Sequence, residues 1–257
     1  MYQEPFKDPN PKCYFSYSLF SSAVSLSKVD HAYNNLLTGK SVCLVGPSPS
    51  LEGSSFGDFI ESHDLVIRLN KGFPLESGKE KDLGSRTDIH YHCLNTLPYC
   101  GGEIPYEELF NESVYICCPY PKFVNPFCID IESFEENNRG RLKYHYIDTD
   151  VYLRVTSSLG TRINSGIGAI LDILCHDIKK VHVTGFTFFK DGWRKSYKDH
   201  VKIFGKEEGE RKEQEWLSGQ FDGNHIQEPQ KHFVREMFLN DKRLSIDEKM
   251  KEILEVK

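Results

Sequence analysis

Two short apolar segments, each ending in glycine, constrain the fold of this chain most. They are Ser41-Val-Cys-Leu-Val-Gly46 and Lys180-Val-His-Val-Thr-Gly185, and short runs of this kind are typical of parallel strands buried on both faces. Residues 65–69, 88–94, 114–118 and 144–147 form four similar segments. Helical spacing of apolar residues over 165–175 and 228–239 places helices between and after them. The alternation predicts an α/β fold with a doubly wound, mostly parallel sheet flanked by helices.

The length of 257 residues suits one large domain with a single buried core. We expect one domain over residues 1–257. It comprises a packed lead-in segment at 1–38, a core at 39–240 and a C-terminal helix at 241–257. The polar stretch from about 191 to 224 is expected to be a long loop, and such a loop in a compact domain usually serves function or moves.

Composition excludes several classes of partner and site. The net charge of −6 supplies no basic surface, so nucleic acid is not an expected partner. No apolar run approaches the roughly 18 residues of a membrane span, and the polar N-terminus lacks the apolar region of a signal peptide. If Met1 is the native start, a cytoplasmic protein is expected. The eight cysteines are irregularly spaced without paired Cys-x-x-Cys elements, which argues against structural zinc.

Polar residues follow two of the predicted strands. Ligands of doubly wound sheets bind at the carboxyl ends of the strands, so the loops after Gly46, Leu69 and Gly185 are the first candidates for a site. Ser48 and Ser50 can offer hydroxyl groups to a phosphate near a helix start. Each serine also fits the plainer role of a turn residue.

Four further candidates lie where a strand ends or a helix begins. Asn70 closes a strand with an amide that can both donate and accept hydrogen bonds to a ribose or base. Asn164, Ser165 and Gly166 open the helix at 165–175, where free N–H groups and a small residue let a nucleotide approach. A strand terminator and a simple N-cap are the plainer alternatives.

Two ordered segments resemble the sialyl motifs of the sialyltransferase family. Residues 43–87 contain Cys-Leu-Val-Gly-Pro-Ser, His-Asp-Leu-Val-Ile-Arg-Leu-Asn and Asp-Leu-Gly-Ser-Arg-Thr. The large motif has the similar Cys-x-Val-Val-Gly-Asn-Ser, His-Asp-x-Val-Ile-Arg-x-Asn and Asp-x-Gly-x-Arg-Thr. Residues 164–186 resemble the small motif, with a helix start, a cysteine and Val-Thr-Gly-Phe. The two segments cover about a quarter of the chain.

The resemblance implies a Rossmann-like fold, the sialyltransferase variant of GT-A. It also implies inverting transfer of sialic acid from CMP-sialic acid to a hydroxyl of a glycan acceptor, with no metal or other cofactor. The residues placed around CMP are Gly46, Ser48, Ser50, Asn70, Asn164, Ser165 and Gly166. Cys43 and Cys175 fall at two motif cysteines that are disulfide-bonded in secretory-pathway members, so we expect them to be neighbours. A Golgi location follows only if the chain was trimmed from a longer one.

The donor is less constrained than the fold, because Pro47 stands where the family has asparagine. Proline has neither an N–H group nor a side-chain amide, so one expected contact is missing or supplied elsewhere. CMP-Kdo, whose sugar is another acidic keto sugar, is therefore an alternative donor. A catalytically inactive protein that binds CMP or a sugar is a further alternative.

Two histidines are candidates for the general base that the family carries in a His-x4-Glu motif. His225 enters a predicted helix after the polar stretch, but Gln230 occupies the glutamate position. His232 has Glu236 on the same helical face, which fits a surface ion pair. A residue at a loop–helix junction can reach a cavity, so we favour His225.

Tyr197 and His200, three residues apart in the polar stretch, are offered for the family's phosphate-binding element rich in His and Tyr, and His200 is the candidate for binding the phosphate. Asp148-Thr-Asp150 imitates the Asp-x-Asp of metal-dependent glycosyltransferases. A CMP donor has a single phosphate and the family needs no metal. We therefore interpret these two aspartates as a strand end or loop, and a metal-dependent glycosyltransferase as the weakest alternative.

Overall fold

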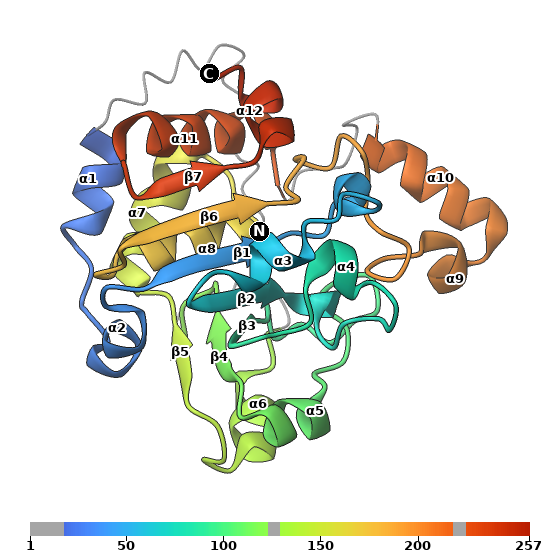
Figure 1. Ribbon diagram of the computed structural model, residues 1–257, viewed down its shortest axis with the longest axis horizontal. Helices are drawn as coiled ribbons and strands as arrows, with labels where there is room; N and C mark the ends of the chain where they lie inside the picture. Colours follow the sequence, from blue (N-terminus) through green and yellow to red (C-terminus); the bar gives the residue numbers. More distant parts are fainter. Residues whose placement is uncertain (1–17, 123–128, 218–224) are drawn as a thin grey trace, which may run out of the picture.

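A computed structural model describes residues 18–122, 129–217 and 225–257 of the protein. Seven strands form one sheet in the order β5-β4-β3-β2-β1-β6-β7, and every neighbouring pair is parallel (Figure 1). The strands are β1 (Ser41–Val45), β2 (Leu65–Leu69), β3 (Ile89–Tyr91), β4 (Tyr115–Cys118), β5 (Tyr144–Tyr146), β6 (Lys180–Thr184) and β7 (Leu244–Ile246). The predicted doubly wound α/β fold is confirmed, and the sheet is wholly parallel.

Helices connect the strands and cover the sheet (Figure 1). They are α1 (Ser18–Val24), α2 (His31–Leu37), α3 (Gly57–Glu61), α4 (Glu80–Leu83), α5 (Tyr106–Glu112), α6 (Ile131–Asn138), α7 (Thr149–Leu159), α8 (Ser165–Leu174), α9 (His200–Phe204), α10 (Lys206–Leu217), α11 (Gln227–Asn240) and α12 (Glu248–Leu254). Two 3-10 turns, η1 (Pro49–Leu51) and η2 (Asn70–Gly72), follow β1 and β2. The turns therefore lie where the sequence predicted ligand-binding loops.

The two faces of β1 pack into different hydrophobic clusters. Val42 and Leu44 belong to the main core, which includes the buried residues of α8. Cys43 and Val45 point to the opposite face and pack into a smaller cluster with Ile60 of α3. This division is the ordinary alternation of a strand buried on both sides.

Strand order reverses direction at β1, which pairs with β2 on one side and β6 on the other. The loops that leave the carboxyl ends of β1 and β6 therefore diverge at a topological switch point, the usual place for a ligand in such sheets. At the base of these loops, the N–H group of Ser48 donates to the carbonyl of Gly185 at 3.0 Å.

Three expectations need correction. Residues 244–246, expected within the C-terminal helix, form edge strand β7, and only Glu248–Leu254 is helical. Within the polar stretch 191–224, α9 and α10 form a helical pair at the side of the domain (Figure 1), and residues 218–224 lie outside the described part. A run such as Lys206–Leu217 forms a helix without an apolar stripe because its charges pair along the surface, as Arg211 does with Glu208.

The third correction concerns Cys43 and Cys175, which are not neighbours. Cys43 packs into the α3 side of the sheet, whereas Cys175 caps the C-terminal end of α8 on the other side. Both thiols are free. The family cysteine stands four residues before the motif glycine, but Cys43 stands three before Gly46. A shift of one residue turns a strand side chain to the opposite face, so Val42 occupies the side that faces α8.

Among the described helices, none combines the length and apolar character required to cross a membrane.

Candidate functional site

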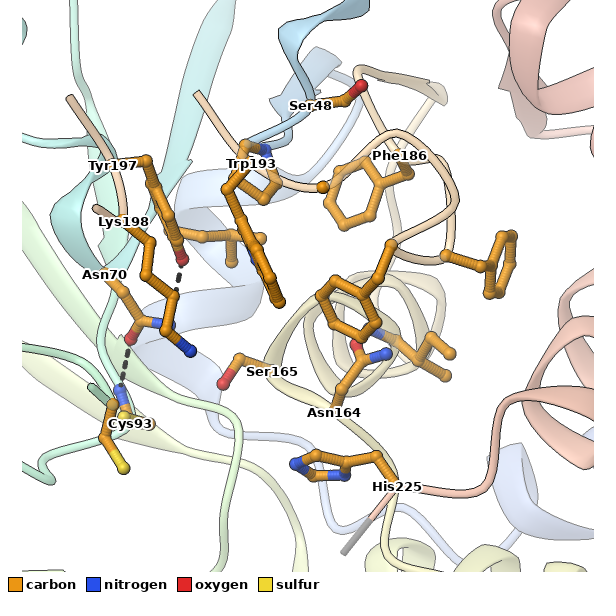
Figure 2. A pocket seen from close by; sticks show the side chains of 18 of the residues that line it. Ser48, Asn70, Cys93, Asn164, Ser165, Phe186, Trp193, Tyr197, Lys198 and His225 are labelled. Atoms are coloured by element: carbon orange, nitrogen blue, oxygen red, sulfur yellow. Dashed lines mark hydrogen bonds between the residues drawn. The ribbon is translucent and has the colours of Figure 1, made fainter. Parts of the chain in front are cut away.

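A cavity of about 600 Å³ opens at the carboxyl ends of the strands. Its walls include the loops after β1, β2 and β6, the first turn of α8 and the segment before α9. His225, two residues before α11, completes this part of the lining. Figure 2 shows Ser48 and Phe186 at one end, His225 at the other, and Ser165 and Lys198 between them. The predicted site residues Ser48, Asn70, Asn164, Ser165, Gly166, His200 and His225 all line this cavity.

Gly46 and Ser50 do not line the cavity. Gly46 lies beneath it, where a Cβ would overlap with the carbonyl of Gly185. Ser50 is exposed, and its N–H group donates to the Ser48 side-chain oxygen at 3.1 Å. The hydroxyl of Ser48 in turn donates to Ser50 Oγ at 2.9 Å, so the pair caps the first 3-10 turn.

Arg194 fastens the loop after β1 from the other side of the switch point. Its buried guanidinium group donates to the Gly46 carbonyl at 2.8 Å and to the Ser48 carbonyl at 3.3 Å. Its own N–H group donates to the carbonyl of Pro47 at 2.9 Å. The tertiary contacts of Arg194 thus hold the loop that contains Pro47, although the proline offers no side-chain amide.

Asn70 joins three segments at the floor of the cavity. Its Oδ1 accepts a hydrogen bond from the Cys93 N–H group at 2.9 Å, and its Nδ2 donates to the Tyr197 hydroxyl at 3.3 Å (Figure 2). The residue adopts a left-handed backbone with φ 44°, a conformation that asparagine tolerates better than most residues. The side-chain amide of Asn70, which the sequence predicted would bind a ligand, therefore also has a structural role. It connects the end of β2 to the loop after β3 and to the segment before α9.

The N-terminus of α8 points toward the cavity. Asn164 is its N-cap: Oδ1 accepts from the Ile167 N–H group at 3.0 Å, and the Asn164 N–H group donates to Gln230 Oε1 at 2.8 Å. The N–H groups at the start of a helix and the helix dipole favour an anion. Ser165, the first helical residue, also hydrogen-bonds the buried Tyr120 hydroxyl.

Gly166 provides room for an aromatic ring. A Cβ at this position would overlap with Phe186, which leaves β6 and packs against the first turn of α8. The sequence predicted that a small residue here would admit a nucleotide, whereas in this structure it admits Phe186.

His225 is held in the form that a general base requires. Its Nδ1 donates to the Arg162 carbonyl at 2.9 Å, because a carbonyl oxygen can only accept. The proton therefore belongs on Nδ1, and Nε2 carries the lone pair, 3.4 Å from Arg162 Nη2. Burial, followed by the charges of Arg162 and Lys198, lowers the pKa of His225 to about 4. The ring is neutral at physiological pH. His232, the alternative candidate, is exposed on α11.

The cavity has a positive lining. Arg162, Lys198 and Lys212 are among its described residues, and no aspartate or glutamate is. Burial, and then the charge of Lys71, lowers the pKa of Lys198 to about 8, so its ammonium group is still mostly protonated at pH 7. His200 is buried with its ring edge-on to Trp193 at 5.4 Å. Burial lowers the pKa of His200 to about 4, which makes it a neutral group in this wall.

The described residues bring one group of metal-ligand types together, and it lies outside the cavity. His145, Asp172 and His176 are buried with candidate ligand atoms within 4.8 Å of one another. His145 is engaged by carboxylates on both sides, Asp30 at 3.0 Å and Asp172 at 3.1 Å. The two residues of the Asp-x-Asp pattern serve α7: Asp148 is its N-cap, and Asp150 pairs with Lys28 at 2.9 Å.

Sequence reasoning missed all three of the described cations that line the cavity, Arg162, Lys198 and Lys212, and gave Arg194 no role. Lys198 directly follows Tyr197, but a lysine in a polar stretch carries no signal of burial. Arg162 stands between two helices in sequence, and only the fold brings it to His225, 63 positions away. Arg194 stood next to the predicted phosphate element, yet its hydrogen bonds to the loop after β1 cross 148 positions of sequence.

Comparison with known proteins agrees with this architecture. Residues 12–117 match the model of glycosyltransferase family 29 (sialyltransferase). A β-1,6-galactosyltransferase of Arabidopsis thaliana is 38% identical over 84 residues, which is 31% of this chain and 21% of that protein. A CMP-N-acetylneuraminate-β-galactosamide-α-2,3-sialyltransferase of Mus musculus is 46% identical over 63 residues, 24% of this chain and 18% of that protein. The alignments thus span about a fifth of these relatives.

Solved structures share the fold over most of the chain. A mammalian sialyltransferase is 19% identical with a TM-score of 0.53, covering 91% of this chain and 79% of that one. CstII of Campylobacter jejuni, solved with the substrate analogue CMP-3FNeuAc, is 14% identical with a TM-score of 0.52 and coverages of 80% and 81%. In its sialyl-motif segments this chain is similar to glycosyltransferase family 29, the sialyltransferases, and in its parallel sheet it shares the fold of solved sialyltransferases.

Proposed function

We propose that this protein is an inverting glycosyltransferase that moves sialic acid from CMP-sialic acid to a hydroxyl group of a glycan acceptor. His225 acts as the general base, and no metal takes part. The proposal draws on the similarity to family 29 and on the composition of the cavity.

The state of His225 is the observation that carries the proposal. A base for an acceptor hydroxyl must be unprotonated, and its lone pair must face the space where the hydroxyl binds. The Arg162 carbonyl at 2.9 Å supports the Nδ1–H form, and Nε2 remains as the acceptor in a ring that lines the cavity. A single displacement then transfers the acceptor proton to Nε2 as the acceptor oxygen bonds to the anomeric carbon and CMP departs.

The leaving CMP phosphate needs positive charge, and the cavity offers it at two places. The N-terminus of α8 presents backbone N–H groups at Ser165 and Gly166, and Lys198 lines the same wall. In a partly dehydrated site these groups stabilise the developing charge more than water does. They would also lower the barrier without a metal.

The same lining favours an acidic donor sugar. Sialic acid and Kdo each carry a carboxylate, which Arg162 or Lys198 can bind as a charge-assisted partner. A neutral sugar such as galactose, which the Arabidopsis relative transfers according to its name, makes no such use of them. Pro47 keeps CMP-Kdo as the second candidate donor, because its replacement of asparagine changes a donor contact.

The test is transfer from CMP-sialic acid to a panel of galactosides, measured as CMP release and as product mass. We expect His225→Ala to lower kcat by about 10²- to 10⁴-fold, the usual contribution of a general base. His232→Ala, an exposed histidine on the neighbouring helix, is the matched control and should retain full activity. Addition of EDTA should leave the rate unchanged.

Three outcomes separate the alternatives. Faster turnover of CMP-Kdo than of CMP-sialic acid would establish the second donor. Tight CMP binding without turnover of any donor would identify a binding protein instead of an enzyme. If neither CMP binding nor CMP release is found, the whole assignment is wrong.

A further inference from the structure

The contact between Arg162 and His225 has features that a simple structural pair does not need. We propose that Arg162 is a positioning residue for the base: its carbonyl fixes the ring of His225, and its guanidinium group covers the Nε2 lone pair until an anionic donor attracts it away. This inference rests on the proposed function, in which Nε2 accepts the proton of the acceptor hydroxyl.

One residue contacts both nitrogens of the imidazole. The Arg162 carbonyl accepts from Nδ1 at 2.9 Å, while Arg162 Nη2 lies 3.4 Å from Nε2. The first distance is that of an ordinary hydrogen bond and the second is long. The ring is thus anchored at its far nitrogen, whereas its reactive nitrogen is held by a weak contact that can be exchanged.

Tyr120 links the guanidinium group to the predicted phosphate site at the start of α8. The guanidinium group packs over the ring of Tyr120 with its carbon 5.6 Å from the ring centre. The Tyr120 hydroxyl in turn contacts Ser165, the first residue of α8. A donor anion at the N-terminus of α8 would therefore bind beside Tyr120, the residue over which the guanidinium group packs.

The chemistry favours an exchange of partners. A guanidinium group binds a phosphate or carboxylate oxygen more strongly than a neutral imidazole nitrogen, because the opposite charge and the bidentate geometry are added to the hydrogen bond. A bound donor would attract Arg162 and release Nε2. The acceptor hydroxyl could then occupy the vacated hydrogen-bonding position, so the base would become available only when the donor is present.

Electrostatics makes this exchange measurable. The charged groups that act on the ring are Arg162, from the segment between α7 and α8, and Lys198, from the segment before α9. Burial has the largest effect on its pKa, and both cations lower that pKa further. Movement of the guanidinium group away from Nε2, or neutralisation of its charge by a donor anion, must therefore raise the pKa of His225.

The test is an NMR titration of the His225 ring in the full chain, assigned by difference from His225→Gln. We expect the wild-type pKa near 4, and an increase of about one unit in Arg162→Met, because one nearby positive charge is lost. Saturating CMP should raise the wild-type value and change the Arg162→Met value much less. Arg154→Met removes an exposed arginine of α7 and should change nothing.

An unchanged His225 pKa in Arg162→Met overturns the inference, as does an equal response to CMP in both proteins. The titration needs no turnover, so it can succeed where transfer fails, and it can fail in an active enzyme. If the protein is active, Arg162→Met should also shift the acid limb of the pH profile of kcat/KM to higher pH, and it should raise KM for the donor. Arg162→Lys keeps the positive charge but lacks the planar guanidinium group that can bind an anion through two N–H groups. This variant should return the pKa of the acid limb to the wild-type value, while KM for the donor should stay high.

Discussion

The ring of Phe186 lies directly against Gly166 at the start of α8, in the space that a side chain at residue 166 would otherwise fill. The contact joins the loop after β6 to the helix whose N-terminus faces the cavity. Both residues belong to the segment that resembles the small sialyl motif. Glycine is therefore required at residue 166 because Phe186 occupies the space that a larger side chain would need.

Gly166→Ala should destabilise the protein by about 1–3 kcal/mol, the usual cost of overpacking a buried site. Its Cβ would overlap with Phe186, so the ring must move into the cavity, and CMP binding should weaken as well. Chemical denaturation and CMP titration measure the two effects. The double variant with Phe186→Ala should recover part of the stability; a Gly166→Ala protein as stable as wild type would contradict the packing.

Asn70→Ala should destabilise the protein more than Asn70→Gly does. Both variants leave the buried Cys93 N–H group without its acceptor, at a cost of about 1–3 kcal/mol. Alanine additionally has to adopt φ 44°, which costs roughly a further 1 kcal/mol, whereas glycine adopts it freely. Denaturation midpoints of the two variants check this order. Equal stabilities would show that the left-handed conformation at residue 70 carries no strain.

Lys198→Met should reduce kcat/KM for the donor by at least tenfold, because it removes a cation from the wall expected to receive the CMP phosphate. Lys195→Met, three residues away and exposed, is the matched control. Donor-concentration series for both variants provide the measurement. The prediction is wrong if the two variants lose activity to the same small extent.

The buried His145 should make stability fall in alkaline solution. Burial would lower its pKa, but Asp172 and then Asp30 more than offset this and raise it to about 9. Because the folded-state pKa exceeds the unfolded value of about 6.5, the protonated ring stabilises the fold fully below pH 6.5. That contribution, roughly 3 kcal/mol, is lost as the pH rises through 9.

The measurement is the free energy of unfolding at pH 6 and pH 9.5 for wild type and His145→Gln. The variant should lose most of the difference between the two pH values. His31→Gln, which changes an exposed histidine at the start of α2, should keep the wild-type dependence. The same dependence in wild type and His145→Gln would exclude His145 as its source.

Oxidation should not link Cys43 to Cys175, because the sheet separates their side chains. Non-reducing peptide mapping after mild oxidation should find each of them in a linear peptide. Recovery of a Cys43–Cys175 disulfide would show that the strand register of β1 is wrong.

Local pattern was sufficient for the fold and for much of the site. The runs that became β1 and β6 are apolar and end in glycine, so a parallel sheet and the ligand loops after these strands followed from sequence. The N-cap Asn164 and the helix behind it were equally visible, because capping depends on neighbouring residues. Strand β7 was missed because three residues at an edge carry too little pattern to distinguish them from a helix stripe.

Tertiary structure alone decided how the cavity is charged and which face a side chain uses. Arg162 reaches His225 across 63 positions and Arg194 reaches Gly46 across 148, distances over which periodicity carries no information. Cys43 lies one residue away from the position of the family cysteine. Because successive side chains of a strand point to opposite faces, Cys43 lies on the opposite side of the sheet. The sequence determined strands β1 to β6, the loops expected to bind a ligand and the candidate residues, because these follow from local hydrophobic and turn chemistry. Only packing determined the partners, because burial and hydrogen bonding depend on segments that the chain brings together when it folds.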